Sequence, residues 1–347
     1  MFKQQRLVAF ALAVGLLLTT AALWAATTLT GAGATFPYPI YSKWFDAYEK
    51  SAGARINYQS IGSGAGIQQL KVKTVDFGAS DAPLSNEEMK SMPGAVIHIP
   101  TVAGAVVLTY NVRGIGKGLR LTPEIVSNIF LGNIRRWNDP AIKRVNPRLS
   151  LPGQPVYVVH RSDGSGTSFI FTNYLSAVSG QWKTSVGSGK SVAWPTGIGG
   201  KGNEGVAGLV KQTPGAIGYV ELAYAVQNKL PYAQVRNRAG QFIEPTIQST
   251  TAAANAASAA IKKDIRALIV NSSGKNAYPI AGFTYILLYK NQSDPGEAKA
   301  LARFLRWAIH DGQKMAKPLL YAPLPAGVVS MNEAALKSVR AGGKPVL

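Results

Sequence analysis

Two long apolar runs of strong β propensity bracket the middle of this 347-residue chain. Residues 96–111 (VIHIPTVAGAVVLTYN) form the first run, and residues 281–289 (AGFTYILLY) form the second. Both are longer than a typical strand, and the block between them has its own alternation of helix and strand patterns. We therefore expect an α/β protein of two lobes joined by two crossing segments, with a ligand held in the cleft between the lobes. Such a shape closes by hinge motion on what it binds.

The two runs also divide the chain. We assign residues 27–110 together with residues 282–347 to a discontinuous first lobe, and residues 111–281 to a second lobe. A chain of 347 residues has ample material for two cores. An apolar content of 46% and a charged fraction of 16% are typical of a globular protein rather than a disordered one.

Residues 1–26 precede both lobes and have the pattern of a secretory signal peptide. Lys3 and Arg6 are followed by an apolar run that ends in Ala25 and Ala26, and we expect cleavage after one of these two alanines. The alternative is an uncleaved membrane anchor, because a run of this length is long enough to span a bilayer. No later run in the sequence is apolar for long enough to do so.

The absence of cysteine and the strong positive charge further limit the class of protein and the partners to expect. Without cysteine the chain forms no disulfide, has no thiol chemistry and lacks the thiol that carries a bacterial lipid anchor. The formal charge is +20, of which Lys3 and Arg6 contribute two, so residues 27–347 carry +18. This charge favours anionic partners, but the basic residues are scattered, which argues against nucleic acid. We expect a soluble periplasmic protein.

The order strand, Gly/Ser-rich loop, helix recurs along the chain. Residues 55–60 (RINYQS) alternate as a strand, residues 62–66 (GSGAG) form a loop, and residues 67–72 continue as a helix. The small-residue loop at residues 31–37 likewise leads into a helical pattern. A helix start leaves backbone N–H groups unpaired and is electropositive. Each of these loops is therefore a candidate contact for an anion.

The loop after the strand pattern at residues 155–160 (PVYVVH) adds charge to this arrangement. It reads RSDGSGTS and precedes an amphipathic helix at residues 169–178. Arg161 supplies a permanent cation whose planar fork of donors suits the oxygens of a carboxylate or phosphate. Asp163 can hold the guanidinium in position, and Ser165 can cap the helix.

Asp81 differs from the loops around it because it is an acid among groups that otherwise offer only donors. It ends a short apolar strand pattern, and Ser85 with Glu88 then forms a capping box for the next helix. A turn-forming role for Asp81 is the alternative interpretation.

Several familiar sites do not fit the sequence. The run Gly189-Lys190-Ser191 resembles a nucleotide phosphate loop, but Thr184 stands where the pattern requires a glycine. The two Gly-rich loops lack the third glycine of the dinucleotide fingerprint, and no G-x-S-x-G elbow is present. His98, His160 and His310 lack the spacing of metal ligands, so we expect structural roles for them. The sequence therefore predicts no metal site and no positioned nucleophile–base pair.

Five motifs together resemble the substrate-binding protein of the bacterial high-affinity phosphate ABC transporter. The resemblance extends from the predicted mature N-terminus through the C-terminal helices, and it implies the type II periplasmic binding-protein fold with ligand between two lobes. The motifs are TGAGATFP (residues 30–37), IGSGAG (61–66), VDFGASDAPLS (75–85), DGSGTSFIFTNYL (163–175) and PGAIGYVE (214–221).

The resemblance also implies a set of ligand contacts and partners. Inorganic phosphate would be held without a cofactor by a monomeric, non-enzymatic periplasmic protein. It would be delivered to an inner-membrane ABC permease with ATPase subunits, and nucleic acid would play no part. The strong basic charge exceeds what we expect of this family. By similarity the phosphate contacts are Thr35, Phe36, Ser63, Asp81, Arg161, Ser165, Gly166 and Thr167, with Asp163 supporting Arg161.

The resemblance gives Asp81 a specific purpose. Phosphate keeps at least one proton at neutral pH whereas sulfate keeps none, so a buried carboxylate can accept the O–H of phosphate but repels sulfate. Two alternatives stay open from the residues alone. One is a phosphatase or transferase that uses the same anion site, and the other is a binding protein for sulfate or molybdate, against which Asp81 argues.

Overall fold

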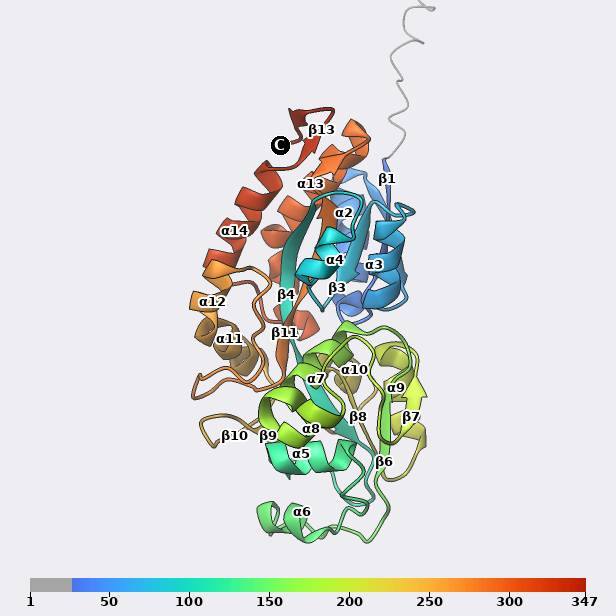
Figure 1. Ribbon diagram of the computed structural model, residues 1–347, viewed down its shortest axis with the longest axis vertical. Coiled ribbons are helices and arrows are strands. Elements are labelled where there is room, and N and C mark those ends of the chain that lie inside the picture. Colours follow the sequence, from blue (N-terminus) through green and yellow to red (C-terminus); the bar gives the residue numbers. More distant parts are fainter. Residues whose placement is uncertain (1–26) are drawn as a thin grey trace, which may run out of the picture.

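The protein has an α/β fold with two lobes, which lie one above the other in Figure 1. The computed structural model describes residues 27–347, and the predicted signal peptide at residues 1–26 lies outside the described residues. Within the described residues, no helix is both long enough and apolar enough to cross a membrane.

One mixed sheet of eight strands runs through both lobes in the order β2-β1-β3-β11-β4-β8-β6-β7. The pairs β1–β2, β1–β3, β6–β8 and β6–β7 are parallel, while β11 pairs antiparallel with β3 and β4, and β4 pairs antiparallel with β8. The strands are β1 (Thr28–Gly33), β2 (Arg55–Ser60), β3 (Phe77–Ser80), β4 (Val96–Tyr110), β6 (Tyr157–Arg161), β7 (Ile198–Gly200), β8 (Ala216–Glu221) and β11 (Ala281–Tyr289). We call the part built on β1, β2 and β3 the first lobe and the part built on β6, β7 and β8 the second lobe.

Strand β4 is the element that both lobes share. Its residues 96–105 pair with β11, and its residues 106–110 pair with β8 of the second lobe. All but its first two residues are buried, which suits a near-continuous apolar run covered on both faces. The predicted long strands at residues 96–111 and 281–289 are thus confirmed to within one residue, and β4 crosses from one lobe to the other.

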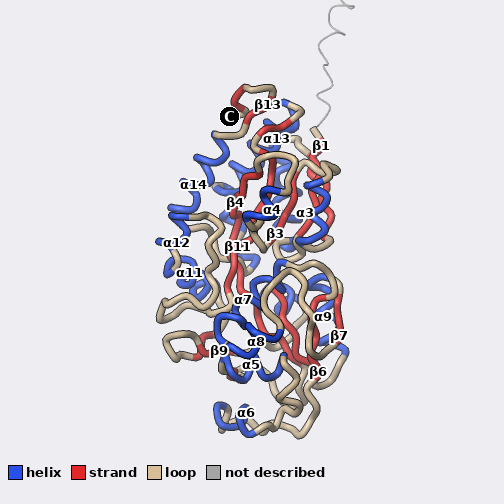
Figure 2. Tube along the Cα trace, viewed as in Figure 1, coloured by secondary structure: helices blue, strands red, loops and turns tan. Residues whose placement is uncertain are grey.

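Helices cover both faces of the sheet in the first lobe (Figure 2). An aromatic cluster joins two of these helices to each other and to the sheet: the ring centroid of Phe45 lies 5.5 Å from that of Phe304 and 6.4 Å from that of Phe77 in β3. The capping box predicted at Ser85 and Glu88 is present. The helices are α2 (Tyr38–Ala52), α3 (Ser63–Lys71), α4 (Asn86–Lys90), α13 (Pro295–Ile309) and α14 (Ala326–Lys337), with 3-10 turns at Asp311–Met315 and Lys317–Leu319.

The second lobe has its own aromatic core. The ring of Phe171 lies 4.7 Å from Phe130 and 4.5 Å from Tyr219, measured between centroids, so two helices pack onto β8. The helices are α5 (Pro123–Phe130), α6 (Pro140–Val145), α7 (Gly166–Val178), α8 (Gly180–Ser185), α9 (Gly202–Gln212) and α10 (Leu222–Gln227). Helix α6 lies at the end farthest from the first lobe (Figure 1).

Two further helices lie beside the first lobe although they fall between the two long strands. They are α11 (Ile247–Ala256) and α12 (Ser258–Lys263), separated at Ala257. Helix α12 packs against α14. The assignment of residues 27–110 with 282–347 and of residues 111–281 to separate lobes therefore stays a prediction.

Six short strands complete the fold. They form two small sheets, β10-β9-β5 and β12-β13-β14, at the margins of the lobes. Their bounds are β5 (Arg120–Leu121), β9 (Gln234–Arg236), β10 (Phe242–Ile243), β12 (Asn291–Gln292), β13 (Arg340–Ala341) and β14 (Lys344–Pro345).

Candidate functional site

The loops predicted to meet an anion converge between the lobes. The backbone N–H of Gly64 donates to the carbonyl of Gly164 at 2.8 Å, and the N–H of Gly166 donates to Ser63 Oγ at 3.1 Å. A Cβ on Gly166 would lie 2.5 Å from both Asp81 Oδ2 and Ser63 Oγ, so only glycine fits there. Residues from both lobes thus share one buried place.

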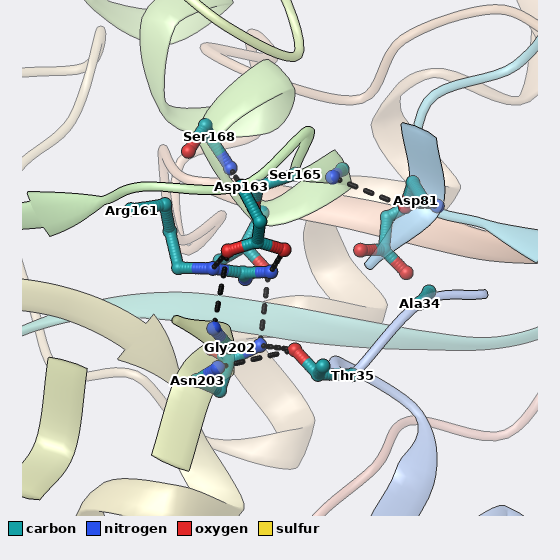
Figure 3. A network of polar contacts seen from close by, with 12 residues as sticks. Ala34, Thr35, Asp81, Arg161, Asp163, Ser165, Ser168, Gly202 and Asn203 are labelled. Carbon is teal, nitrogen blue, oxygen red and sulfur yellow. Dashed lines mark hydrogen bonds and ion pairs between the residues drawn. The ribbon is translucent and has the colours of Figure 1, made fainter. Parts of the chain in front are cut away.

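Every one of the predicted contacts is buried in or beside this place. The exposed fraction is 3% for Arg161 and 2% for Asp81, so water reaches neither side chain freely. Figure 3 shows Thr35 and Asp81 on one side of the site and Arg161 with Asp163 on the other. The remaining predicted contacts, all buried, are Thr35, Phe36, Ser63, Ser165, Gly166 and Thr167.

Local sequence explains how the two helix starts are formed. Helix α3 begins at Ser63, earlier than residues 67–72 suggested, because Gly62 adopts a φ of 91° just before it. Helix α7 begins at Gly166, and Ser165 caps it as predicted: its Oγ accepts the N–H of Ser168 at 3.0 Å. Both starts therefore place hydroxyl-bearing residues and backbone N–H groups at the edge of the cleft.

Arg161 is the last residue of β6 and is held from two sides. Its Nε donates to Asp163 Oδ1 at 2.7 Å, and Nη2 pairs with the other oxygen of the same carboxylate. Although burial favours the neutral acid, Arg161 keeps the pKa of Asp163 below its usual value. The N–H of Gly202 also donates to Asp163, at 3.1 Å. Arg161 and Asp163 thus form a neutral, fixed pair whose Nη1 still faces Thr167 at 3.4 Å.

Three hydroxyl groups in the site are already used as acceptors. Ser63 Oγ accepts from the N–H of Gly166 at 3.1 Å and from that of Asp81 at 3.3 Å. Thr167 Oγ1 accepts from Asn203 Nδ2 at 3.1 Å and from Arg161. Thr35 Oγ1 accepts two bonds, at 3.1 and 2.7 Å, both from Asn203. A hydroxyl has two lone pairs and one hydrogen, so each of the three is left as a donor.

Asp81 supplies a hydrogen-bond acceptor in the same buried place between the lobes. It follows β3 directly, and within residues 27–347 its Oδ1 has no hydrogen-bond partner. Burial raises the pKa of Asp81 to about 7, against the opposing influence of the Thr284 hydroxyl and of Arg161. A buried acceptor left unmatched costs about 1–3 kcal/mol, so this oxygen is an unsatisfied acceptor among poised donors.

Two tyrosines hold the loop that contains Thr35 and Phe36. The hydroxyl of Tyr224 donates to the carbonyl of Thr35 at 2.6 Å, and that of Tyr321 donates to the carbonyl of Phe36 at 2.7 Å. Because both carbonyls are tied back into the protein, the peptide N–H groups of this loop are fixed in direction. Neither tyrosine carries a local motif that would have pointed to this role.

A second acid, Glu221, is buried behind this loop. Its side chain is 0% exposed, and Oε2 accepts the N–H of Ala223 at 2.7 Å. Burial raises the pKa of Glu221 well above its ordinary value. Burial therefore disfavours the charged form of this acid.

Asn203 is a residue of the site to which no sequence motif points. It lies in the first turn of α9, whose N-cap is Lys201. Its side chain reaches Thr35 and Thr167. An asparagine near a helix start carries no local signal for contacts with residues so distant in sequence.

The histidines and acids elsewhere form no metal centre. In the part of the chain that the structure describes, no group of three or more His, Cys, Asp or Glu residues is placed to hold an ion. His98 Nε2 accepts the N–H of Leu84 at 3.0 Å, and burial lowers its pKa to about 4. That histidine is a neutral structural residue.

Comparisons with known proteins agree with this geometry. A family model described as a PBP superfamily domain matches residues 20–311. The phosphate-binding protein PstS of Haemophilus influenzae is 49% identical over 88% of this chain and 91% of its own length. PstS of Pasteurella multocida is 47% identical over 94% of this chain and 95% of its own. A phosphate-binding protein structure from Stenotrophomonas maltophilia superposes with a TM-score of 0.66 at 21% identity, covering 89% of this chain and 94% of that one. The chain therefore belongs to the PstS family of phosphate-binding proteins, within the PBP superfamily.

Proposed function

We propose that the cleft binds one inorganic phosphate ion and that the protein delivers it to an inner-membrane ABC permease for high-affinity import. The observation that carries the proposal is the pairing of opposite groups in one buried place. Hydroxyls whose lone pairs are filled face the same site as an acid with an unmatched oxygen. A tetrahedral anion that still carries a proton satisfies both.

Binding a phosphate ion in a buried cleft requires a donor for nearly every oxygen, because the ion loses its hydration shell. The donors proposed are the hydroxyls of Thr35, Ser63 and Thr167, with Ser165 and Arg161. The N–H groups of Phe36 and Gly166 lie at the loop and helix start beside them. Bonds to a charged acceptor are roughly twice as strong as neutral ones. The N–H of Gly166 is paired with Ser63 Oγ, so it reaches the ion only by giving up that bond, and Ser63 then keeps one filled lone pair, from the N–H of Asp81.

Asp81 supplies the discrimination. Its unmatched Oδ1 accepts the O–H of phosphate, whereas sulfate presents only lone pairs to it. A site built to bond a substrate O–H rejects an analogue that lacks it by a factor on the order of a thousand or more. The same argument disfavours molybdate, which is also unprotonated near neutral pH.

An enzyme built on this site is the second candidate, and the same residues speak against it. A phosphatase needs a nucleophile with an adjacent base or a metal ion. The hydroxyls here accept from N–H groups, the carboxylate of Asp163 is engaged by Arg161, and within residues 27–347 no side-chain hydrogen bond joins Asp81 to any of these hydroxyls as donor. Each group is arranged to hold a small ion rather than to attack one.

Transport context and location are part of the proposal. The relatives are named phosphate-binding proteins, and the first 26 residues have the pattern of a signal peptide. A periplasmic monomer that meets its permease after closing on phosphate fits this pattern. Reconstituted permease and ATPase subunits should hydrolyse ATP faster when the phosphate-loaded protein is added, and the absence of any stimulation would argue against this partner.

Isothermal titration calorimetry of residues 27–347 tests the ligand directly. At pH 8 we expect saturable binding of one phosphate per chain, and sulfate binding weaker by about a thousandfold or more. Equal affinities for the two anions, or no heat with phosphate, would contradict the proposal. Release of phosphate from a phosphate monoester by the purified chain would favour the enzyme instead.

A further inference from the structure

We infer that Asn203 is a positioning residue that turns one hydroxyl from each lobe into a donor for the anion, and that it does so when the lobes are closed. The inference rests on the proposed phosphate site and adds to it the group that sets the direction of its donors. It concerns a residue that touches the site's hydroxyls rather than the ion.

The side-chain amide of Asn203 has a fixed orientation. Its Oδ1 accepts the backbone N–H of Glu221 at 2.8 Å, so Nδ2 must point the other way, toward the cleft. Nδ2 has two hydrogens, and it donates to Thr35 Oγ1 at 2.7 Å and to Thr167 Oγ1 at 3.1 Å. The side chain is 0% exposed, so water does not compete for these bonds.

Thr35 receives a second bond from the same residue. The backbone N–H of Asn203 donates to Thr35 Oγ1 at 3.1 Å. Both lone pairs of this hydroxyl are therefore filled by Asn203, and its single hydrogen is left for another acceptor. Without Asn203, the hydroxyl can point its hydrogen elsewhere and present a lone pair to the anion.

The bonds to Thr35 cross from one lobe to the other. Thr35 follows β1 in the first lobe, and Asn203 lies in α9, which packs on β6 and β8 of the second. These residues are 168 positions apart in sequence, whereas Thr167 belongs to the same lobe as Asn203. An opening of the cleft separates Thr35 from Asn203 and releases its hydroxyl. Thr35 is therefore held as a hydrogen-bond donor to the ion only while the lobes are closed. This slows the dissociation of a bound ion more than it changes the rate of binding.

The chain offers a matched control for loss of a buried asparagine. Asn237 is 4% exposed, and its Nδ2 donates to the carbonyl of Lys275 at 2.8 Å while its Oδ1 accepts from Ala239 and Gln241. It fixes a loop far from the anion site. Asn237→Ala should lower the melting temperature while leaving the phosphate affinity of the folded protein within about twofold.

The test is a double-mutant cycle on phosphate affinity, measured by calorimetry at pH 8. Asn203→Ala should weaken phosphate about tenfold or more in the wild-type background, mostly through faster dissociation in stopped-flow traces. In a Thr35→Val background, which removes the hydroxyl that Asn203 directs, the same change should cost less than about threefold. Any loss of phosphate affinity that Asn203→Ala still causes in the Thr35→Val background measures the effect of Asn203 on Thr167.

The outcomes separate this inference from the proposed function. If wild-type protein binds phosphate and Asn203→Ala binds it equally well, the positioning role is wrong while the function stands. Equal losses in both backgrounds indicate a purely structural role and overturn the inference as well. If Asn203→Ala does not fold, Asn203→Ser takes its place, because its short hydroxyl cannot reach both threonines, and the same criteria apply.

Discussion

The two sides of the cleft approach the anion with different chemistry. The first lobe contributes an acid, Asp81, and no cation. The second lobe contributes a cation, Arg161, whose charge is balanced by its own partner Asp163. Hydroxyls from both sides supply the neutral donors. Under the proposed function, the first lobe would distinguish protonated from unprotonated ligands, and the second lobe would supply the only cation among the described residues of the site.

The largest effect should come from removing the acid of the first lobe. Asp81→Asn replaces the unmatched carboxylate oxygen by an amide that can donate to any oxyanion. We expect the ratio of phosphate to sulfate affinity to fall by about a thousandfold, chiefly because sulfate binds more tightly. Paired calorimetric titrations at pH 8 measure both constants. Undiminished exclusion of sulfate in a folded variant would show that Asp81 does not discriminate.

Removing the cation of the second lobe should weaken phosphate and leave the selectivity in place. Arg161→Ala removes a buried cation and leaves Asp163 as a partly buried carboxylate without its partner, and loss of one member of such a pair costs about 2–5 kcal/mol. We therefore expect phosphate affinity to drop by at least about thirtyfold, while sulfate stays excluded. Arg236→Ala is the control, because that arginine pairs with Glu124 on the surface at 3.0 Å. A wild-type phosphate affinity in Arg161→Ala would contradict the role assigned to the second lobe.

The pH dependence of sulfate binding sharpens the contrast between the lobes. Burial raises the pKa of Asp81 to about 7, so this acid is mostly ionised at pH 8 and mostly neutral at pH 6. The neutral acid can donate to sulfate, which itself does not titrate in this range. Sulfate affinity of the wild-type protein should rise about tenfold from pH 8 to pH 6. In Asp81→Asn the sulfate affinity should be flat over the same range, and a slope of equal size there would assign the effect to another group.

The raised pKa of Asp81 also makes the stability of the folded protein depend on pH. The folded protein holds the proton of Asp81 more tightly than the unfolded chain does, because the pKa of Asp81 is raised from 3.8 to about 7. This group therefore makes the folded state less stable as pH rises from about 4 to 7. Phosphate opposes the loss, because its O–H stabilises the ionised carboxylate.

The smallest effect should come from the ion pair at the rim of the cleft. Lys190 Nζ of the second lobe lies 2.5 Å from Glu88 Oε1 of the first, and both side chains are partly exposed. Exposed pairs contribute at most about 1 kcal/mol, so Lys190→Ala should weaken phosphate by no more than about fivefold, with the difference vanishing at high salt. Lys183→Ala, a change at another lysine of the second lobe, is the control. A salt-independent loss of tenfold or more would make this pair part of the binding site.

Much of the site followed from local sequence because the relevant interactions are local. Ser165 caps α7 through Ser168, three residues on, and Ser85 with Glu88 forms its capping box over the same spacing. The ion pair of Arg161 and Asp163 spans two residues. Such interactions depend on nearby side chains and backbone angles, so a pattern of residue types is enough to predict them.

The groups that escaped prediction all act over long separations. Tyr224 reaches the loop at Thr35 across 189 residues, and Tyr321 reaches Phe36 across 285. Asn203 reaches Thr35 across 168 residues. No local rule identifies a buried hydroxyl or amide that will be brought to a distant loop by the packing of two lobes.

The crossing strands, the Gly/Ser loops at helix starts and the identity of the charged groups follow from short segments of sequence, since β propensity, helix capping and glycine's conformational freedom are local properties. The direction in which the hydroxyls point depends on how the lobes pack. Filling both lone pairs of Thr35 from Asn203 requires the first and second lobes to meet, and leaving Asp81 Oδ1 unmatched requires its burial between them. These are consequences of long-range packing, in which each donor must find a partner or remain available to the ligand.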